Sequence, residues 1–259
     1  MRKILLILSI LIHWCSSGQS ENESGRILFV VSNAHYYGDT DINTANHFAE
    51  IVLAYDEFTK AGYEVDFISP EGGRVPLGYI YSDQLLQEYL FDSMFMEKLD
   101  NTLRPNEVRA ADYAAIYYPG GGAAMFGIHN NEAIKEIAVA IYQQPSGIIS
   151  AVCHGTAGIA DIRLANNQLL VKGKKVSGFP DLFENKEAAY YKTFPFSIEE
   201  RIRDNGGEFL YSEEGWDEHY VIDDKLITGQ DPTSSAGVAQ AVIKKIQQKQ
   251  TSKNSKNTK

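Results

Sequence analysis

Short apolar runs alternate with longer amphipathic segments between residues 26 and 245. Apolar runs of about four to six residues suit buried strands, whereas apolar residues spaced three or four apart suit helices. Regular alternation of the two is typical of a mostly parallel sheet covered by helices. No Gly/Ser/Pro-rich linker divides the pattern, so we expect one α/β domain over residues 26–248.

The pattern assigns residue ranges to most of these elements. The predicted strands span 27–31, 65–68, 113–118, 147–152, 209–211, 220–222 and 226–228. The predicted helices span 45–61, 156–160, 196–204 and 234–247. Residues 169–171 and 175–179, on either side of Lys172-Gly173-Lys174, predict a short strand pair.

The tripeptide Cys153-His154-Gly155 lies where a predicted strand ends and a helix begins. In open α/β folds this edge of the sheet faces the ligand-binding crevice. Helix N-terminal amides favour a thiolate over a thiol, so we expect an acidic Cys153. A cysteine in an apolar strand is usually a small buried hydrophobe. The neighbouring His154, as a base or backbone donor, and the small Gly155 favour a nucleophile on a sharp elbow.

Residues 119–122, Pro-Gly-Gly-Gly, follow another predicted strand on the same sheet edge. Glycines let the backbone turn sharply and leave N–H groups facing the crevice. A phosphate-binding loop is disfavoured because the downstream Gly-Lys-Ser/Thr and the full GxGxxG are absent from the sequence. We therefore expect an oxyanion hole made by amides of Gly121, Gly122 and His154.

Composition excludes several other classes of site and partner. The sequence contains no CxxC or HxxxH, which disfavours a structural zinc site, and we expect neither a metal nor a cofactor. The formal net charge of −10 argues against nucleic acid or an anionic membrane surface as the main partner. A small molecule is the expected ligand.

The first 18 residues resemble a secretory signal peptide. Arg2 and Lys3 precede an apolar run at 4–12, and small residues at 16–18 precede Gln19. The run is too short to span a bilayer, so we expect a secreted or periplasmic protein. Lipidation of Cys15 is disfavoured because Trp14 stands where a small residue is expected.

Removal of residues 1–18 leaves Cys153 as the only thiol, so no intrachain disulfide can form. The loss of two basic residues takes the net charge from −10 to −12. At the other end, residues 249–259 carry Lys, Ser, Asn, Gln and Thr without an apolar stripe. We expect a disordered tail there.

Six segments in order resemble the ThiJ/PfpI family of the class I glutamine amidotransferase-like superfamily. They are 61–65 with 69–73 (AGYEV and SPEGG), 118–121 (YPGG), 151–155 (AVCHG), 172–179 (KGKKVSGF) and 226–232 (LITGQDP). Within the family the chain most resembles the heat-shock chaperone and glyoxalase III (D-lactate dehydratase) branch. The resemblance implies a flavodoxin-like three-layer sandwich with a nucleophile elbow and no cofactor.

The resemblance also implies two catalytic acids. The acid of the first helix falls on Glu50, between apolar neighbours, whereas Glu57 suits a solvated helix face. A carboxyl beside a sulfur in a dry pocket tends to keep its proton and can shuttle it. The acid that orients the histidine falls on Glu184, with Asp181 as the alternative. Together with Cys153 and His154, these acids form the expected catalytic set.

The implied activity is conversion of small 2-oxoaldehydes such as methylglyoxal to 2-hydroxy acids without glutathione. Two alternatives stay open: a Cys-dependent peptidase or amidase, and a non-catalytic holdase chaperone or redox sensor. True glutamine amidotransferases carry their catalytic histidine far downstream in a His-x-Glu pairing. Residues 219–221, His-Tyr-Val, do not supply one, so glutaminase chemistry is disfavoured. Departures from the family at Ala54, Ala123 and Thr156 affect the shape of the pocket. A homodimer is compatible with the sequence.

Overall fold

A computed structural model describes residues 25–257 of the chain. The predicted signal peptide at 1–18, Cys15 included, lies outside the described residues. Within the described part, no helix combines the length and the apolar character needed to cross a membrane.

A six-stranded sheet forms the centre of the molecule, in the order β3-β1-β5-β6-β10-β9. Neighbouring strands are parallel except that β9 runs antiparallel to β10. The strands are β1 Arg26–Val30, β3 Val65–Ile68, β5 Tyr113–Tyr118, β6 Ile148–Val152, β9 Tyr220–Asp223 and β10 Leu226–Gly229. The order places β5 and β6 at the centre, so the chain segments that follow them meet at one edge.

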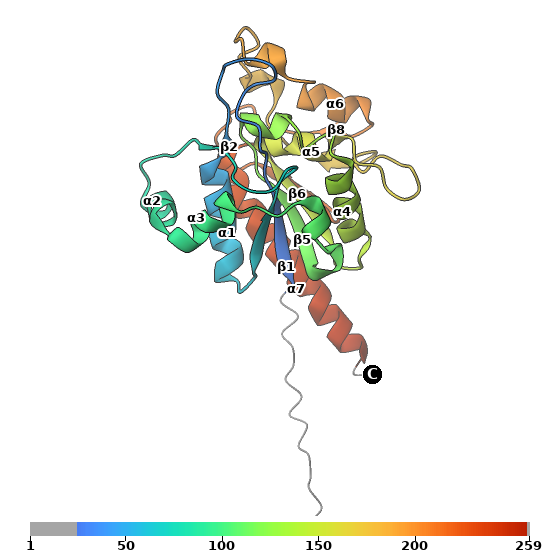
Figure 1. Ribbon diagram of the computed structural model, residues 1–259. Helices are drawn as coiled ribbons and strands as arrows, with labels where there is room; N and C mark the ends of the chain where they lie inside the picture. Colours follow the sequence, from blue (N-terminus) through green and yellow to red (C-terminus); the bar gives the residue numbers. More distant parts are fainter. Residues whose placement is uncertain (1–24, 258–259) are drawn as a thin grey trace, which may run out of the picture.

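Helices cover both faces of this sheet (Figure 1). One layer contains α1 Phe48–Lys60, α2 Gln84–Phe91, α3 Ser93–Asp100 and α7 Ser235–Asn257. The other contains α4 Glu132–Gln143, α5 Ala157–Ala160 and α6 Ile198–Asp204. This arrangement confirms the predicted flavodoxin-like three-layer sandwich with a mostly parallel sheet.

The side chains of β1 show how the two cores arise. Ile27 and Phe29 pack in the core under α1 and α7, whereas Leu28 and Val30 pack under α4. Successive strand residues point to opposite faces, and both faces of this sheet are covered. An interior parallel strand therefore needs a continuous apolar run, which is what the sequence has.

Two small sheets lie outside the central one. Strand β2 Asn46–His47 pairs with β4 Leu77–Gly78, and β7 Lys175–Val176 pairs with β8 Glu208–Phe209. The predicted strand pair between 169–171 and 175–179 is therefore wrong. Leu169 forms an isolated bridge with Arg163, and residues 170–171 form a turn whose Leu170 and Val171 side chains enter the core. Strand β7 takes a partner from more than 30 residues away. Burial of these apolar side chains outweighs the local hairpin pattern.

The C-terminal helix also differs from the sequence prediction. Helix α7 continues to Asn257, where a disordered tail is expected from residue 249. The segment contains neither Gly nor Pro. Extending a helix whose first turns already pack on the sheet costs far less than nucleating a new one. The polar composition alone does not reveal this continuation.

Candidate active site

Cys153 lies at the sharp turn between β6 and the short 3-10 helix η4 Cys153–Thr156. Its φ of 57° falls in the left-handed region, which non-glycine residues rarely adopt. Strain of this kind persists only where the surrounding structure holds it, and it clusters at functional sites. A Cβ on Gly155 would lie 2.1 Å from the Tyr118 carbonyl oxygen, so the elbow can pack on β5 only with glycine there.

The three groups expected to react meet beside Gly120. A Cβ built on Gly120 would lie 2.7 Å from the amide nitrogen of His154, 2.9 Å from Cys153 Cβ and 3.0 Å from Glu50 Oε2. The loop after β5, the elbow after β6 and helix α1 therefore converge on one small volume. Any side chain at position 120 would fill it.

His154 links the cysteine to an acid. Its Nδ1 lies 3.4 Å from Cys153 Sγ, and its Nε2 lies 2.7 Å from Glu184 Oε1. A carboxylate accepts the Nε2 proton, which leaves Nδ1 as an acceptor facing the thiol. The ring is stacked on Phe179, with centroids 4.8 Å apart.

Of the two acids considered for this position, Glu184 contacts His154. Asp181 instead accepts hydrogen bonds from Lys186 Nζ at 2.8 Å and Ser197 Oγ at 2.7 Å. Both acids belong to the segment around the 3-10 helix Asp181–Phe183. Asp181 is thus a structural residue of this segment, and Glu184 faces the site.

Glu50 is fully buried in the first turn of α1. The amide N–H of Gly120 donates to its Oε2 at 2.6 Å, its buried Oε1 has no hydrogen-bond partner among the described residues, and its carboxyl lies beside Cys153. Burial raises the pKa of Glu50 to about 8, despite the opposing effect of the Gly120 hydrogen bond. The carboxyl therefore keeps its proton through neutral pH.

Burial also raises the pKa of the Cys153 thiol, and a charged Glu50 raises it further. The amide N–H of His154 acts in the opposite direction. The expectation of a thiol made acidic by helix amides is therefore wrong in direction, because the helix is short and Cys153 is only 3% exposed. Two buried anions in contact are unfavourable, so the two groups titrate as a coupled pair and do not both ionise readily.

The predicted oxyanion-hole residues all line the cavity, but their amides have different partners. Gly121 and Gly122 line the same cavity as Cys153 and His154. The amide of His154 donates to the Cys153 sulfur, whereas that of Gly122 donates to the Tyr79 hydroxyl. Gly121 has a φ of 92°, and a Cβ there would lie 2.5 Å from the Ala45 carbonyl oxygen. Glycine at 121 is thus required by backbone packing.

A cavity of ≈350 Å³ opens above Cys153, and aromatic rings form most of its wall. The rings come from loops on both sides of the sheet edge. They belong to Tyr37, Tyr79, Tyr81, Phe179, Phe183, Tyr190, Phe194 and Trp216. Ligand sites are typically apolar with a few placed polar groups, and this cavity has that character.

His47 is a site residue that the sequence analysis missed. It caps α1, where its Nδ1 accepts the Glu50 amide N–H at 3.4 Å, and its Nε2 lies 3.3 Å from the Tyr81 hydroxyl. Its ring stacks on Tyr79 with centroids 4.5 Å apart. Burial lowers the pKa of His47 to about 3, so the ring is neutral. Its position three residues before Glu50, on the same helix face, is the signal that could have revealed it.

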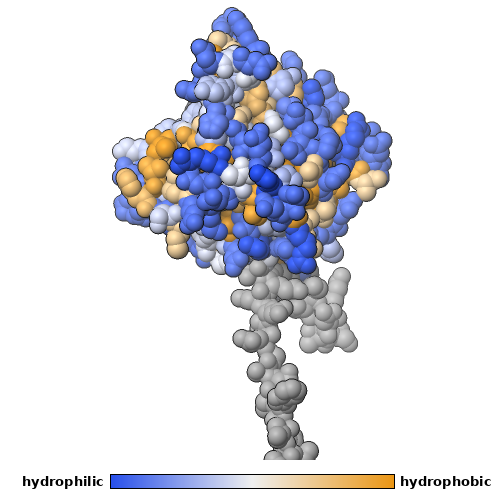
Figure 2. Space-filling model, viewed as in Figure 1, coloured by the Kyte–Doolittle hydropathy of each residue, from blue (hydrophilic) through white to orange (hydrophobic). Residues whose placement is uncertain are grey.

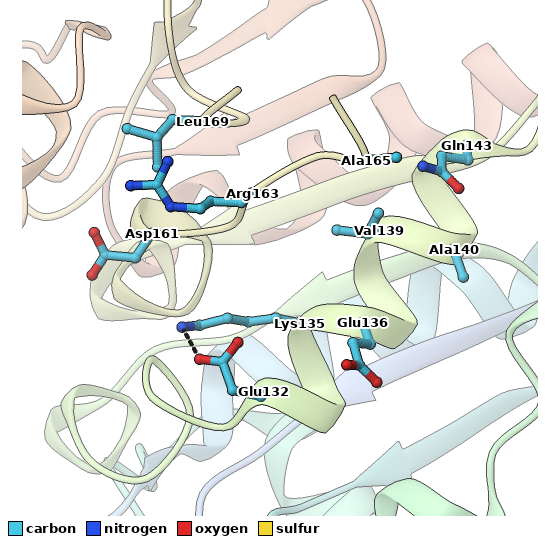
Figure 3. A pocket seen from close by; sticks show the side chains of 10 residues that line it. All are labelled: Glu132, Lys135, Glu136, Val139, Ala140, Gln143, Asp161, Arg163, Ala165 and Leu169. Carbon is cyan, nitrogen blue, oxygen red and sulfur yellow. Dashed lines mark hydrogen bonds and ion pairs between the residues drawn. The ribbon is translucent and has the colours of Figure 1, made fainter. Parts of the chain in front are cut away.

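A larger hollow of ≈560 Å³ lies elsewhere, between α4 and residues 161–169 (Figure 3). It contains the Glu132–Lys135 ion pair and shares no lining residue with the cysteine cavity. The described residues that line it include no Cys, Ser, Thr or His side chain, whereas the smaller cavity contains the Cys153–His154 pair, so the smaller cavity is the candidate active site. Among residues 25–257, no group of three or more His, Cys, Asp or Glu side chains is arranged to hold a metal ion.

Proteins of known sequence similar to this chain include several fungal glyoxalases. A probable glutathione-independent glyoxalase of Saccharomyces cerevisiae is 29% identical over 231 residues, covering 81% of this chain and 93% of that protein. A glutathione-independent glyoxalase of Schizosaccharomyces pombe is 27% identical over 238 residues, covering 85% and 95%.

Solved structures share the fold. The rapid encystment protein of Francisella tularensis superposes with a TM-score of 0.80 at 25% identity, over 86% of this chain and 99% of that chain. Glyoxalase III of Candida albicans gives 0.78 at 24% identity, over 86% and 98%. The DJ-1/PfpI family matches residues 44–245, a span that includes Glu50, the glycine loop, the elbow and Glu184. The chain therefore belongs to the DJ-1/PfpI family.

Proposed function

We propose that this protein is a cofactor-independent glyoxalase that converts small 2-oxoaldehydes such as methylglyoxal to 2-hydroxy acids without glutathione. The observation that carries the proposal is the buried contact between the Glu50 carboxyl and the Cys153 thiol, beside the His154 amide. Similarity to proteins named glutathione-independent glyoxalases supports it. Such a reaction needs a nucleophile and a proton carrier in one dry site, and both are present.

The first step forms a carbon–sulfur bond. The Cys153 thiol first gives its proton through His154 Nδ1, 3.4 Å away, to solvent; the sulfur then adds to the aldehyde carbon, and the carbonyl oxygen takes the proton held by Glu50 to give a hemithioacetal. The His154 amide, which already lies against the sulfur, stabilises the developing oxyanion together with the Gly121 amide, and the Gly122 amide contributes once the oxyanion replaces the Tyr79 hydroxyl as its acceptor. Glu50 is left as a carboxylate.

The second step moves a proton between two carbons. The Glu50 carboxylate removes the hydrogen from the former aldehyde carbon and returns it to the neighbouring carbon, while the hydroxyl proton of the hemithioacetal passes to the former ketone oxygen through an enediol. The product is a thioester of Cys153 with a 2-hydroxy acid. Water then cleaves the carbon–sulfur bond: one water proton returns through His154 to the sulfur, the proton of the released acid returns to Glu50, and the product leaves as the 2-hydroxy carboxylate.

His154 and Glu184 serve the water-dependent step. With its Nε2 proton held by Glu184 at 2.7 Å, the ring presents Nδ1 as the base that takes a proton from the attacking water. The acid fixes the tautomer and does not itself react.

A turnover assay on the purified chain tests this function. Methylglyoxal and glyoxal are supplied without glutathione, and the 2-hydroxy acid is measured directly. We expect saturable turnover in the wild type and none in Cys153→Ala, because no second thiol lies among the described residues. A hydrolase would instead cleave small esters or amides and leave methylglyoxal untouched. That result would overturn the proposal.

A holdase chaperone is a second candidate because apolar side chains gather over α2 and α3 (Figure 2). Phe91 is 82% exposed and Met94 is 74% exposed. Exposed apolar surface of this kind binds unfolded clients. Phe91→Ser with Met94→Ser would then abolish protection of a heat-aggregating client, while Cys153→Ala would leave it intact. Equal protection by the surface variant and the wild type would exclude this candidate.

A further inference from the structure

A second, apolar groove of ≈360 Å³ adjoins the catalytic cavity. Tyr81, Trp216 and Pro232 line both hollows, so the two meet along these three side chains. The groove continues over Ala49 and Leu53, which lie one turn apart on α1. The same helix carries Glu50, so the groove begins beside the proton carrier.

The groove is apolar over most of its length. Leu86 of α2 closes its far side, and Asp83 and Thr233 are the polar residues on its wall. Asp83 is occupied as the N-cap of α2, where it accepts the Leu86 amide N–H at 3.2 Å. The surface left for a ligand is therefore hydrocarbon and aromatic.

The backbone holds one ring of the catalytic cavity, Tyr79, and one ring of the junction, Trp216, at a conformational cost. Tyr79 has a φ of 58° and Trp216 a φ of 55°, values that bulky residues rarely adopt. The Trp216 amide N–H donates to Asp231 Oδ2 at 2.9 Å, which fixes the strained turn. Trp216 is nonetheless 60% exposed. A ring held rigidly but left in water gains contact area when an apolar ligand covers it.

The cavity is also large for a three-carbon substrate. A volume of ≈350 Å³ above Cys153 falls in the range of sites for much larger ligands, and the adjoining groove contributes ≈360 Å³. Methylglyoxal could contact only a small part of this aromatic wall. The chemistry at Cys153 uses two carbons, and it leaves the rest of the hollow for a substituent.

We infer that the groove binds the apolar substituent of a larger 2-oxoaldehyde, with an alkyl chain or an aromatic ring attached to the ketone carbon. The inference rests on the proposed glyoxalase function. The aldehyde and ketone carbons lie at Cys153 and Glu50, and the substituent passes Tyr81 and Trp216 to reach Leu53. The bonds made and broken are those of methylglyoxal turnover.

Steady-state kinetics on a homologous series tests the inference. The series runs from methylglyoxal through straight-chain alkylglyoxals of increasing length, with phenylglyoxal as the aromatic member. Burial of a methylene in such a groove is expected to raise kcat/KM by up to about fourfold. We expect a rise along the series until the groove is filled. A kcat/KM that is flat or falls with length would overturn the inference while leaving the proposed function intact.

Leu53→Gln tests the groove itself. Glutamine keeps the side chain's size and helix preference but adds an amide where the alkyl chain would pack. We expect unchanged kcat/KM for methylglyoxal and a flattened dependence on chain length. Ile222→Gln, at an exposed apolar residue of β9 outside the groove, is the matched control and is expected to keep the wild-type dependence. Should Leu53→Gln fail to fold, Thr233→Arg places a charged chain at an exposed position of the groove wall.

A binding measurement separates this inference from the proposed function. In full-length Trp14→Phe protein, Trp216 is the only tryptophan, so its fluorescence reports occupancy of the groove. Straight-chain methyl ketones from butanone to octan-2-one serve as unreactive probes. Binding that tightens with length, in a protein that turns over no 2-oxoaldehyde, would retain the apolar site and reject the glyoxalase. A Leu53→Gln change in oligomeric state without any effect on ketone binding would overturn the inference in favour of an interface between two copies.

Discussion

The protonation state of Glu50 affects that of Cys153, and the reverse also holds. Each is buried, a charged Glu50 raises the pKa of the Cys153 thiol, the thiol lowers the pKa of Glu50, and one amide N–H contacts each of them. A neutral carboxyl beside a thiolate can donate its proton as the sulfur attacks, and it is then the base that the next step requires. This reciprocity explains why a glutamate occurs in the interior of an apolar helix face.

The raised pKa of Glu50 makes stability depend on pH. In the unfolded chain this carboxyl ionises near pH 4.5, whereas in the fold it keeps its proton until about pH 8. The unfolded state therefore loses the proton first, and the free energy of unfolding falls as pH rises between these values. Glu50→Gln removes this dependence.

We expect the stability of Glu50→Gln relative to the wild type to increase from pH 5 to pH 8 by a few kcal/mol, on the order of the pKa difference. Urea denaturation of both proteins at several pH values measures it. A stability difference that stays constant across this range would show that Glu50 is ionised in the fold.

Glu184 and Asp181 provide a matched pair of variants. Glu184→Gln loses the carboxylate that fixes the His154 tautomer, so we expect kcat to fall roughly 10²-fold with little change in KM. Asp181→Asn weakens contacts to Lys186 and Ser197 only and is expected to keep kcat. Steady-state kinetics decides. Equal losses in the two variants would mean that the segment acts only as a scaffold.

His47 connects helix capping to catalysis. His47→Phe removes the acceptor of the Glu50 amide N–H, and loss of such a cap costs about 0.5–2 kcal/mol. We expect lower stability together with slower turnover, because the start of α1 carries Glu50. His47→Asn restores an N-cap acceptor and is expected to recover the stability in thermal unfolding. Recovery of neither property by asparagine would indicate that the imidazole itself, and not the cap, matters.

At the scale of elements, the sequence predicted the strands that are marked by a continuous apolar run. The apolar runs of β1, β3, β5 and β6 were predicted to within a residue or two, because interior parallel strands have few other sequence solutions. Helices α2, α3 and α4 received no prediction, although their N-caps Asp83, Asp92 and Asn131 were readable signals. The β7–β8 pair was missed because its partners lie far apart in the chain.

The elbow depends on close packing of η4 against β5. Gly155→Ala would place a methyl group 2.1 Å from the Tyr118 carbonyl oxygen, so the two elements must separate. We expect a loss of more than about 2 kcal/mol of stability, together with loss of activity, as for overpacked cores. Gly173→Ala is the control, since no atom lies within 4 Å of its added Cβ. There only the left-handed φ of 70° is penalised, by about 1–2 kcal/mol. Similar losses in both variants, measured by urea denaturation, would contradict the packing argument.

At the scale of the whole molecule, the sequence predicted the fold class and the elbow but not the shape of the cavity. Cys153 and His154 belong to one short motif, and the glycines at 120–122 belong to another, so each was visible in the sequence. Glu50 is about 100 residues from the cysteine, and only family resemblance pointed to it. The aromatic wall joins Tyr37, Tyr79 and Trp216 from separate loops, and no local pattern reveals that they meet.

Export concerns the whole chain and stays a prediction, because the signal-like residues 1–18 lie outside the described part. We expect the mature protein to begin near Gln19, because Arg2 and Lys3, an apolar run and small residues precede it. Mass spectrometry of the N-terminus of the native protein measures this. An intact N-terminus at Met1 or Arg2 would reject cleavage, and a lipidated Cys15 would replace secretion with membrane anchoring.

Carbon-13 NMR of Glu50→Gln with methylglyoxal labelled at the aldehyde carbon tests the central claim most directly. The claim is that Cys153 forms the bond to the substrate and that Glu50 then transfers the proton. We predict a protein-bound hemithioacetal signal that persists, lactate formation slowed by about 10²–10⁴-fold, and no such signal in the Cys153→Ala, Glu50→Gln double variant. Lactate formed at the wild-type rate by Glu50→Gln, or a bound signal that survives loss of Cys153, would contradict the account.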